Sequence, residues 1–471
     1  MERPCFKYEA IANRLEDQIR RKVYRHGEQI PSIRELCRIE KASPGIIHQA
    51  MGLLEARGLI EARPRSGYYV TARTLAPAAP APPVDLMEPR VVGMNNITAE
   101  VLREAGNPNL VPLGAAIPAP ELFPVEKLSR LMASVARSHA SLLGSYHLAP
   151  AHPELLRQLE KWFYSIECPV TSEEIVMANG ATEALNLAIR AVTRPGDIVA
   201  VESPTYFGFL QILESLGLKT LMIPGDDEHG INLDRLAEAL QRYPVKAVVL
   251  IPSYNNPTGA CLSEEKRMRL LSLLGEVPLV EDDVYGNLYF GKERPRPVKA
   301  FDRKGQVIYC SCVSKTIAPS LRLGWVAAGR YAERVRRLKW ISTLTTSPLD
   351  QLTLARFLAS ESVDRHLRRL RQAVHQQVTA MRNAILSHVP AGTIVNNPGG
   401  GLFLWVRLPE GVDSIRFYHR LVQEGILVMP DSLFCPLSND RRAIRISCGH
   451  PFTGRIGWAI ERAGEILHRE F

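Results

Sequence analysis

The stretch that decides the fold of this 471-residue chain spans residues 309–325 and reads YCSCVSKTIAPSLRLGW. Lys315 stands near its centre, among small and apolar residues and directly after a β-rich run, where a solvated surface charge is not expected. Desolvation lowers the pKa of a lysine and frees its amine to attack a carbonyl group, as an imine-forming lysine requires. Arg322 carries a planar guanidinium that suits a phosphate. The pair indicates a pyridoxal 5'-phosphate (PLP) site, and the alternative is a strand-end lysine near an arginine in a salt bridge.

Strand-length and helix-length segments alternate on both sides of this stretch. The β-rich runs are 197–202, 220–223, 247–251, 279–281 and 307–310. Helical patterns at 183–190 and 264–274 lie between several of them. The alternation predicts an α/β fold with a largely parallel sheet, in which ligands gather at the carboxyl ends of the strands.

Two motifs that follow predicted strands suit a phosphate and a flat ring. Residues 179–185 (NGATEAL) put a small-residue turn directly before a helix, where free backbone N–H groups and the helix dipole attract an anion. Tyr206, in the run SPTYF, offers an aromatic face on which a flat ring can stack. Each motif also has a structural explanation, since many helices begin this way and an aromatic residue there can belong to the core.

Two further motifs bring polar groups to strand ends. The run 252–259 (PSYNNPTG) is too polar for a core, and the amide of Asn256 can donate a hydrogen bond to a phenolate oxygen. Asp282 and Asp283 end another predicted strand, where like charges cost energy unless a cation lies opposite. A protonated pyridinium nitrogen is such a cation, and an aspartate beside it maintains the electron sink.

These motifs, in this order, resemble those of fold-type I PLP enzymes of the class I/II aminotransferase family, from about residue 113 to the C-terminus. The resemblance implies the PLP-dependent transferase fold, with a mostly parallel sheet and a smaller α+β C-terminal subdomain. It implies that Lys315 forms the Schiff base, that Asp282 pairs with the ring nitrogen and that Tyr206 stacks on the ring. It also implies that Asn256 and Tyr285 bind the ring hydroxyl oxygen.

The resemblance also assigns the anionic groups of the ligands. The phosphate is held by Ala181, Thr182, Ser314 and Arg322, with Tyr146 contributed by a neighbouring subunit. Arg445, in the run AIRIS, matches the arginine that grips a substrate carboxylate. Three positions depart from the family pattern: Cys312 stands where Ser or Thr is common, and Ala116 and Ala151 stand where glycines are common.

The N-terminal segment has a different pattern. The apolar stripe Ile11, Leu15, Ile19 and Val23 predicts an amphipathic helix over 7–25. A capping box of Ser32 and Glu35 predicts a short second helix to about residue 39, and Ser43-Pro44 opens a third helix. The third helix is expected to bury Ile47, Ala50, Met51 and Leu54 and to leave residues 45, 46, 48 and 49 partly outward. Two short strands, 59–63 and 67–70, complete a predicted winged helix-turn-helix.

Three motifs, PSxREL at 31–36, LExxGLI at 54–60 and RxxxGxxV at 63–70, resemble the DNA-binding domain of GntR-type regulators. A helix N-terminus favours phosphate, and an arginine reaches phosphate or guanine. The predicted DNA-binding residues are Arg34, Ser43, Pro44, Gly45, His48, Arg65 and Gly67. The family usually has Arg and Thr where Pro44-Gly45-Ile46 stands, and a domain that mediates only protein contacts is the alternative.

Composition separates the two parts. Residues 1–75 hold 14 Lys/Arg against 9 Asp/Glu, a net charge of +5 out of +9 for the chain, which hints at a polyanionic partner. The Ala/Pro-rich residues 74–90 predict an extended linker. We therefore expect a DNA-binding domain over 1–73, this linker, and an aminotransferase-like domain over 91–471.

The remaining composition restricts location and metal chemistry. No apolar run has membrane-spanning length and the N-terminus lacks a signal-peptide pattern, so we expect a cytoplasmic protein without a membrane partner. Eight cysteines are scattered without CxxC spacing, which indicates neither a disulfide framework nor a metal site. Cys310 and Cys312 are expected to be reduced packing residues.

A GntR-type winged helix joined by a linker to an aminotransferase-like domain resembles the MocR-type regulators. The resemblance implies a PLP-dependent transcription factor that binds double-stranded DNA and senses an amine or amino acid by imine exchange at Lys315. It also implies a homodimer, commonly domain-swapped. The alternative is a working aminotransferase with an accessory N-terminal domain, and the residues do not separate the two because the same constellation serves both.

Overall fold

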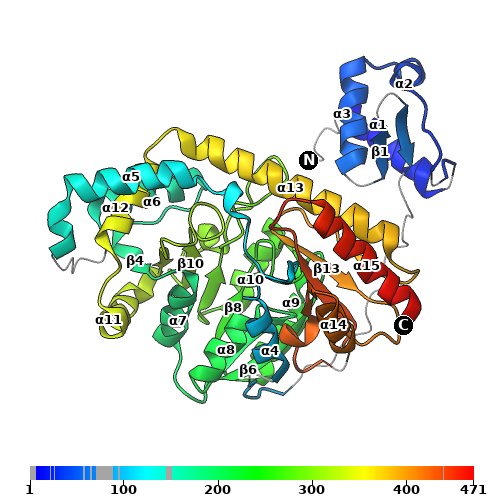
Figure 1. Cartoon of the computed structure of the whole chain (residues 1–471). Coiled ribbons are helices and arrows are strands. Elements are labelled where there is room, and N and C mark those ends of the chain that lie inside the picture. Colours follow the sequence, from blue (N-terminus) through cyan, green and yellow to red (C-terminus); the bar gives the residue numbers. More distant parts are fainter. Residues whose placement is uncertain are drawn as a thin grey trace. The chain divides into compact units, whose positions relative to one another are not determined.

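The computed structural model describes residues 7–21, 23–25, 27–56, 59–63, 66–70, 88–93, 96–144, 151–438 and 440–470. The chain forms two compact units, which are described separately (Figure 1). Residues 74–87 of the expected linker, Arg65 and Tyr146 lie outside the described residues. None of the described helices is long and apolar enough to cross a membrane.

The N-terminal unit has the predicted winged-helix order. Its elements are α1 (Lys7–Arg20), α2 (Ile33–Ile39), α3 (Pro44–Ala56), β1 (Ile60–Arg63) and β2 (Gly67–Val70). The expected inner face of α3 is completely buried against α1, and β1 pairs with β2 antiparallel. The capping box forms as predicted, because the Ser32 hydroxyl accepts from the Glu35 N–H and the Glu35 carboxylate accepts from the Ser32 N–H.

The first helix is shorter than predicted. It ends at Arg20, and Val23, the last residue of the expected stripe, is 60% exposed. The reason lies in pairing that is distant in sequence: the N–H of Gly27 donates to the carbonyl of Val70 at 2.9 Å, and Gln29 forms a bridge with Tyr69. The chain must leave the helix early to run beside β2, and the apolar spacing alone does not show this.

The large sheet of the second unit has the order β4-β11-β10-β9-β8-β5-β6-β7. Strands β10, β9, β8, β5 and β6 run parallel, which confirms the predicted sheet, whereas β11 is antiparallel to both its neighbours and β7 to β6. The strands are β4 (Ile175–Ala178), β5 (Ile198–Ser203), β6 (Lys219–Asp226), β7 (Gly230–Ile231), β8 (Val245–Leu250), β9 (Leu279–Asp282), β10 (Val307–Cys312) and β11 (Gly324–Ala327).

Helices cover this sheet, and the two predicted helices are present (Figure 1). The helices after residue 90 are α4 (Asn96–Glu104), α5 (Val125–Ser138), α6 (Pro153–Ser165), α7 (Ala181–Val192), α8 (Phe207–Ser215), α9 (Leu233–Arg242), α10 (Glu264–Leu274), α11 (Ala332–Thr343), α12 (Pro348–Leu358), α13 (Ser362–His388), α14 (Ser414–Gln423) and α15 (Gly454–Glu470). A smaller antiparallel sheet, β12 (Ile394–Val395), β13 (Phe403–Arg407), β16 (Ala443–Ser447) and β15 (Met429–Pro430), and a parallel pair, β3 (Val111–Pro112) with β14 (Ile426–Leu427), form the expected α+β subdomain.

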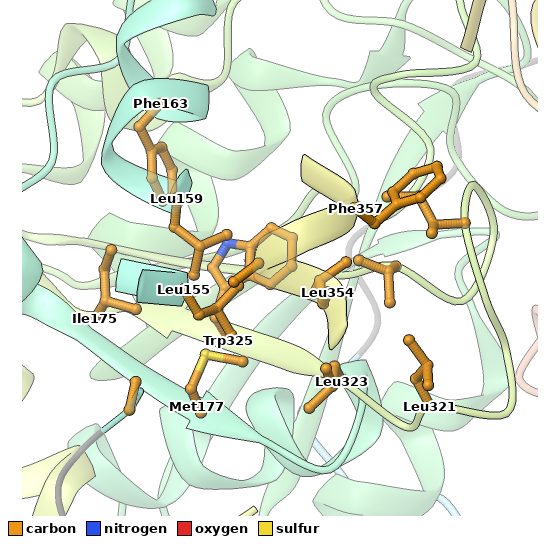
Figure 2. Packing of buried hydrophobic residues seen from close by; sticks show 14 of the residues in the cluster. Leu155, Leu159, Phe163, Ile175, Met177, Leu321, Leu323, Trp325, Leu354 and Phe357 are labelled. Carbon is orange, nitrogen blue, oxygen red and sulfur yellow. The ribbon is translucent and has the colours of Figure 1, made fainter. Parts of the chain in front are cut away.

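A buried apolar cluster fixes the stretch that contains Lys315. Figure 2 shows Trp325 of β11 among side chains of α6, β4 and α12. Val313, Ile317 and Leu321, which flank Lys315 in sequence, belong to the same cluster. Each such side chain contributes about 1.5–3 kcal/mol when fully buried. The apolar residues of the stretch therefore anchor the loop in the core, which fixes the position of Lys315 and Arg322.

Candidate functional site

A cavity of about 250 Å³ lies where β9 and β10 end and α7 begins. It brings together every predicted cofactor and effector residue that the structure describes. These are Ala181, Thr182, Tyr206, Asn256, Asp282, Tyr285, Ser314, Lys315, Arg322 and Arg445. The convergence of residues from 181 to 445 on one cavity is a tertiary property, because they come from both the large sheet and the smaller subdomain.

Lys315 has the environment that its sequence neighbours predict. Its Nζ donates a hydrogen bond to the backbone carbonyl of Ala116 at 2.6 Å. Desolvation lowers the pKa of Lys315, and the nearby Arg445 and Arg322 cations lower it further, although Cys312 and Asp282 oppose them. A larger share of the amine is therefore unprotonated than for an exposed lysine.

The two consecutive aspartates have different surroundings. Asp282 lines the cavity and its carboxylate accepts from the Val284 N–H at 3.2 Å, while burial raises its pKa to about 7. Asp283 does not line the cavity; its carboxylate is paired with Arg294 and accepts from the Tyr309 hydroxyl at 2.7 Å. Arg294 thus compensates one of the two adjacent charges, and Asp282 is the one left for a cation in the cavity.

Two glycines shape a cradle at the start of α7. Gly180 caps this helix with a φ of 86°, and a Cβ at Gly324 would lie 2.7 Å from the Gly180 carbonyl carbon. Arg322 reaches the same place, where its Nη1 donates to the Ser314 hydroxyl and its Nη2 to the Asn179 carbonyl, both at 3.4 Å. These long hydrogen bonds are weak. The guanidinium, the Ser314 hydroxyl and the first N–H groups of α7 therefore fit a phosphate.

Asn256 and Arg445 meet in the same cavity. Arg445 Nη1 donates to the Asn256 Oδ1 at 2.7 Å, so the donor left to Asn256 is its amide NH2 group. Tyr285 is buried beside them with its ring edge-to-face against Phe403, and burial raises the pKa of its hydroxyl. Asn256 and Tyr285 can thus both present a donor to a ring oxygen.

Arg445 is a buried cation in the middle of β16. It is 1% exposed, and its guanidinium lies 4.5 Å from the centre of the Phe403 ring and 5.0 Å from that of Phe434. Its Nη2 donates to the Gly114 carbonyl, whereas its Nε finds no hydrogen-bond partner within the described part of the chain. Desolvation lowers its pKa to about 10. A buried arginine that contacts only neutral groups is suited to receive a carboxylate.

Sequence reasoning missed the apolar part of the lining. Leu102 and Ala105, from α4 and the turn after it, line the cavity together with Phe207, Val284 and Met429. No short motif marks them, because they become neighbours only when α4 and the smaller subdomain fold against the large sheet. Cys310 and Cys312 are both buried and free, as expected of reduced packing residues, and Cys312 also lines the cavity.

The residues of this cavity fit PLP in four respects. They supply an amine for its aldehyde, an acid for its ring nitrogen, donors for its ring oxygen, and a guanidinium at a helix N-terminus for its phosphate. Tyr206 also lines the cavity, with an aromatic face for the ring. Lys315 and Arg322 come from one loop, but the other groups come from the ends of other strands and from the start of α7, so the fit does not follow from any single motif.

In the N-terminal unit, the described DNA-binding candidates are exposed: Arg34, Ser43, Pro44, Gly45, His48 and Gly67. Arg34 lies in the first turn of α2, which the Ser32–Glu35 box caps. Gly67 has a φ of 106°, and a Cβ there would lie 2.8 Å from the Gln29 Nε2, which donates to the Ser66 carbonyl at 2.5 Å. The hairpin therefore requires glycine at this position.

Comparisons with known proteins match both parts of the chain. The profile of the gntR family of bacterial regulatory proteins matches residues 7–70, and that of aminotransferase class I and II matches residues 124–453. The uncharacterized HTH-type transcriptional regulator YdcR of Escherichia coli (strain K12) is 37% identical over 464 residues, which cover 98% of this chain and 99% of YdcR.

Two solved structures resemble the second unit. Kynurenine aminotransferase of Pyrococcus horikoshii, in complex with PMP, has a TM-score of 0.75 at 28% identity and covers 80% of this chain and 96% of its own. LysN, the α-aminoadipate aminotransferase of Thermus thermophilus, complexed with N-(5'-phosphopyridoxyl)-L-leucine, has a TM-score of 0.73 at 28% identity and covers 80% and 95%.

Proposed function

The chain belongs to the MocR-type regulators, in which a GntR winged helix is joined to a class I/II aminotransferase domain, and from this premise we propose that it senses an amino acid and regulates transcription. Its cofactor is PLP, and its winged helix binds DNA. We propose the domain division 1–73, 74–90 and 91–471, a cytoplasmic location and a homodimer, which the family commonly forms by domain swapping.

We assign to Lys315 the covalent attachment of the cofactor and the exchange with an incoming amine. When bound, PLP supplies an aldehyde carbon that forms imines with primary amines. The lowered pKa of Lys315 supports this role, because an unprotonated amine can attack that carbon and can later take up a proton when it leaves. Asp282 holds the positive charge of the ring nitrogen, and Arg322, Ser314 and the start of α7 hold the phosphate.

The proposal that the effector is an amino acid rests on the position of Arg445. Its guanidinium is buried in the same cavity as Lys315, contacts the oxygens of Asn256 and Gly114, and has a free Nε within the described part of the chain. An α-carboxylate would replace these neutral acceptors with a charged one, which adds a Coulomb attraction to the hydrogen bonds. The exchange would release the Asn256 oxygen and change the contact between the smaller subdomain and the large sheet.

Such a change is what a regulator needs, because a ligand shifts an equilibrium between two states only by its differential affinity for them. Lys315 and Arg445 both change partners when an amino acid binds, and the linker connects their domain to the winged helix. A catalytically competent aminotransferase is the second candidate, and the predicted cofactor residues that line the cavity support it.

Two experiments test the proposal. Borohydride reduction of the purified protein should fix the cofactor to the peptide that contains Lys315, and a label on another lysine would contradict the site. Amino acids that change the visible spectrum of the protein should then change its affinity for DNA from the upstream regions of candidate genes. Turnover with an α-keto acid acceptor, without any effect on DNA affinity, would instead support the aminotransferase.

A further inference from the structure

A second concave site lies at the far end of α7 from the cofactor cavity. It is a groove of about 690 Å³, within the usual size of ligand pockets. Five cationic side chains line it, together with one acidic side chain, that of Asp197. The cations are Arg190, Arg194, Lys246, Arg334 and Arg337. The groove therefore carries a net charge of +4, almost half of the net charge of +9 of the whole chain.

None of these five cations forms an ion pair within the described residues. Asp197 is already used, since its Oδ2 accepts from the backbone N–H of Arg194 at 2.8 Å. Other cations of the same helix α11 are paired: Arg336 with Glu333 at 2.6 Å and Lys339 with Glu183 at 2.8 Å. On α11, the cations outside the groove are therefore neutralised by acidic residues, whereas Arg334 and Arg337, which line the groove, are not.

Two of the cations have a structural role. Arg190 lies in the last turn of α7 and donates to the Ser342 hydroxyl at 3.1 Å, and Arg334 donates to the Ala191 carbonyl at 3.4 Å. Cations near a helix C-terminus stabilise it through the helix dipole. This explanation does not extend to Arg194, Lys246 and Arg337, which are exposed and have no described hydrogen-bond acceptor for their side chains.

The groove is separate from the cofactor site. Leu185 is the last residue of α7 that lines the cofactor cavity and Arg190 is the first that lines the groove, so five residues of the helix, or about 7.5 Å, separate them. Lys246 lies at the start of β8, whereas Ile251, just after its end, lines the cofactor cavity. A ligand in the groove would therefore leave the PLP phosphate cradle untouched. In Figure 1, α7 and α11, which form the groove, lie side by side.

We propose that this groove binds a compact polyphosphate, such as a nucleoside polyphosphate, as a second ligand of the regulator. Several convergent cations without counter-charges suit a ligand with several closely spaced negative charges. Val192, Leu338 and Ile341 form an apolar part of the same groove, and Ile341 is 69% exposed. They offer a surface for an organic group next to the phosphates.

Duplex DNA is the competing occupant, and the shape of the groove disfavours it. The groove encloses only about 690 Å³, whereas the major groove of B-DNA alone is roughly 12 Å wide and the whole duplex is wider. A duplex could touch the rim of the groove but could not enter it. A chain of two or three phosphates is small enough to contact cations on α7, β8 and α11 together.

The test uses the full-length, PLP-loaded protein and isothermal titration with tripolyphosphate, ATP, AMP and adenosine. We expect tripolyphosphate and ATP to bind with an affinity that falls as salt rises, AMP to bind more weakly and adenosine not to bind. ATP binding more tightly than tripolyphosphate identifies a nucleoside polyphosphate, and equal affinities identify the polyphosphate chain as the recognised group.

The triple variant Arg194→Ala/Lys246→Ala/Arg337→Ala tests whether the ligand binds in the groove. It should weaken tripolyphosphate binding at least ~10-fold, because three of the five attractions are lost. The matched control, Lys161→Ala/Arg303→Ala/Arg469→Ala, removes three exposed cations that also lack a described ion pair and should change nothing. Unaltered visible spectra and melting temperatures show that both variants fold.

Three results would overturn the proposal. Wild-type protein without affinity for tripolyphosphate excludes the site, and an equal loss in both triple variants shows only a general charge effect. Intact tripolyphosphate binding in the groove variant places the ligand elsewhere. If tripolyphosphate does not bind but the groove variant lowers the salt dependence of binding to a mixed-sequence duplex, the groove contacts DNA, and the small-ligand proposal fails.

Discussion

Replacing Arg445 by Met should remove the recognition of an α-carboxylate while leaving the cofactor in place. Methionine fills much of the same volume between Phe403 and Phe434 without a charge. The change also deletes the buried Nε that lacks a described partner, but it costs the hydrogen bonds to Asn256 and Gly114. These effects oppose each other, so we expect the free energy of unfolding to change by only about 1 kcal/mol.

The effect on ligand binding should be larger. The carboxylate and the guanidinium are both charged, so their contact adds a Coulomb attraction to hydrogen bonds that each contribute about 1.5–3 kcal/mol. A net loss equivalent to one such hydrogen bond corresponds to a roughly 13- to 160-fold loss of affinity. An amine without a carboxylate does not use this contact, so the substitution should lower its affinity only slightly.

The assay compares L-phenylalanine with 2-phenylethylamine, which share a side chain and differ by the carboxylate. Both are titrated against wild type and Arg445→Met, and the visible absorption of the cofactor is followed. Arg442→Met, at an exposed arginine three residues earlier, serves as the control. An equal loss of affinity for both ligands, or no loss for L-phenylalanine, would refute the assignment of Arg445 to the carboxylate.

Three further predictions concern other parts of the chain. Arg34→Ala should weaken DNA binding by about 1–3 kcal/mol if Arg34 contacts a base, or mainly reduce the salt dependence if it contacts phosphate; unchanged anisotropy titrations at every salt concentration would remove it from the interface. Gly324→Ala should lower PLP affinity and the melting temperature, because the added Cβ would lie 2.7 Å from the Gly180 backbone; an unchanged dissociation constant for PLP would contradict the tight packing of the cradle. Burial raises the pKa of Glu202 to about 8, so the folded state binds a proton that the unfolded state has released. Stability should fall between about pH 4.5 and pH 8 by up to about 1.4 kcal/mol per unit from this group, and chemical denaturation of Glu202→Gln should show a smaller pH dependence.

The sequence by itself determined the features that depend on neighbouring residues. The helix over 264–274 begins and ends as predicted, because Ser263 caps its first turn and Gly275 follows with a φ of 57°. The Ser32–Glu35 box formed for the same local reason. The motifs that carry the cofactor residues were also readable, since each is a loop that directly follows a strand or precedes a helix.

Tertiary structure decided what depends on distant partners. The end of α1 follows from pairing with β2, and the different surroundings of Asp282 and Asp283 follow from Arg294, which no spacing rule connects to them. β11, inside the stretch that defines the site, is antiparallel because it returns beside β10 to pair with β4. The buried contact between Arg445 and Asn256 joins residues 189 positions apart. Local propensity predicts the elements, but only the packed chain determines which side chains face one cavity, because burial and charge compensation depend on the fold as a whole.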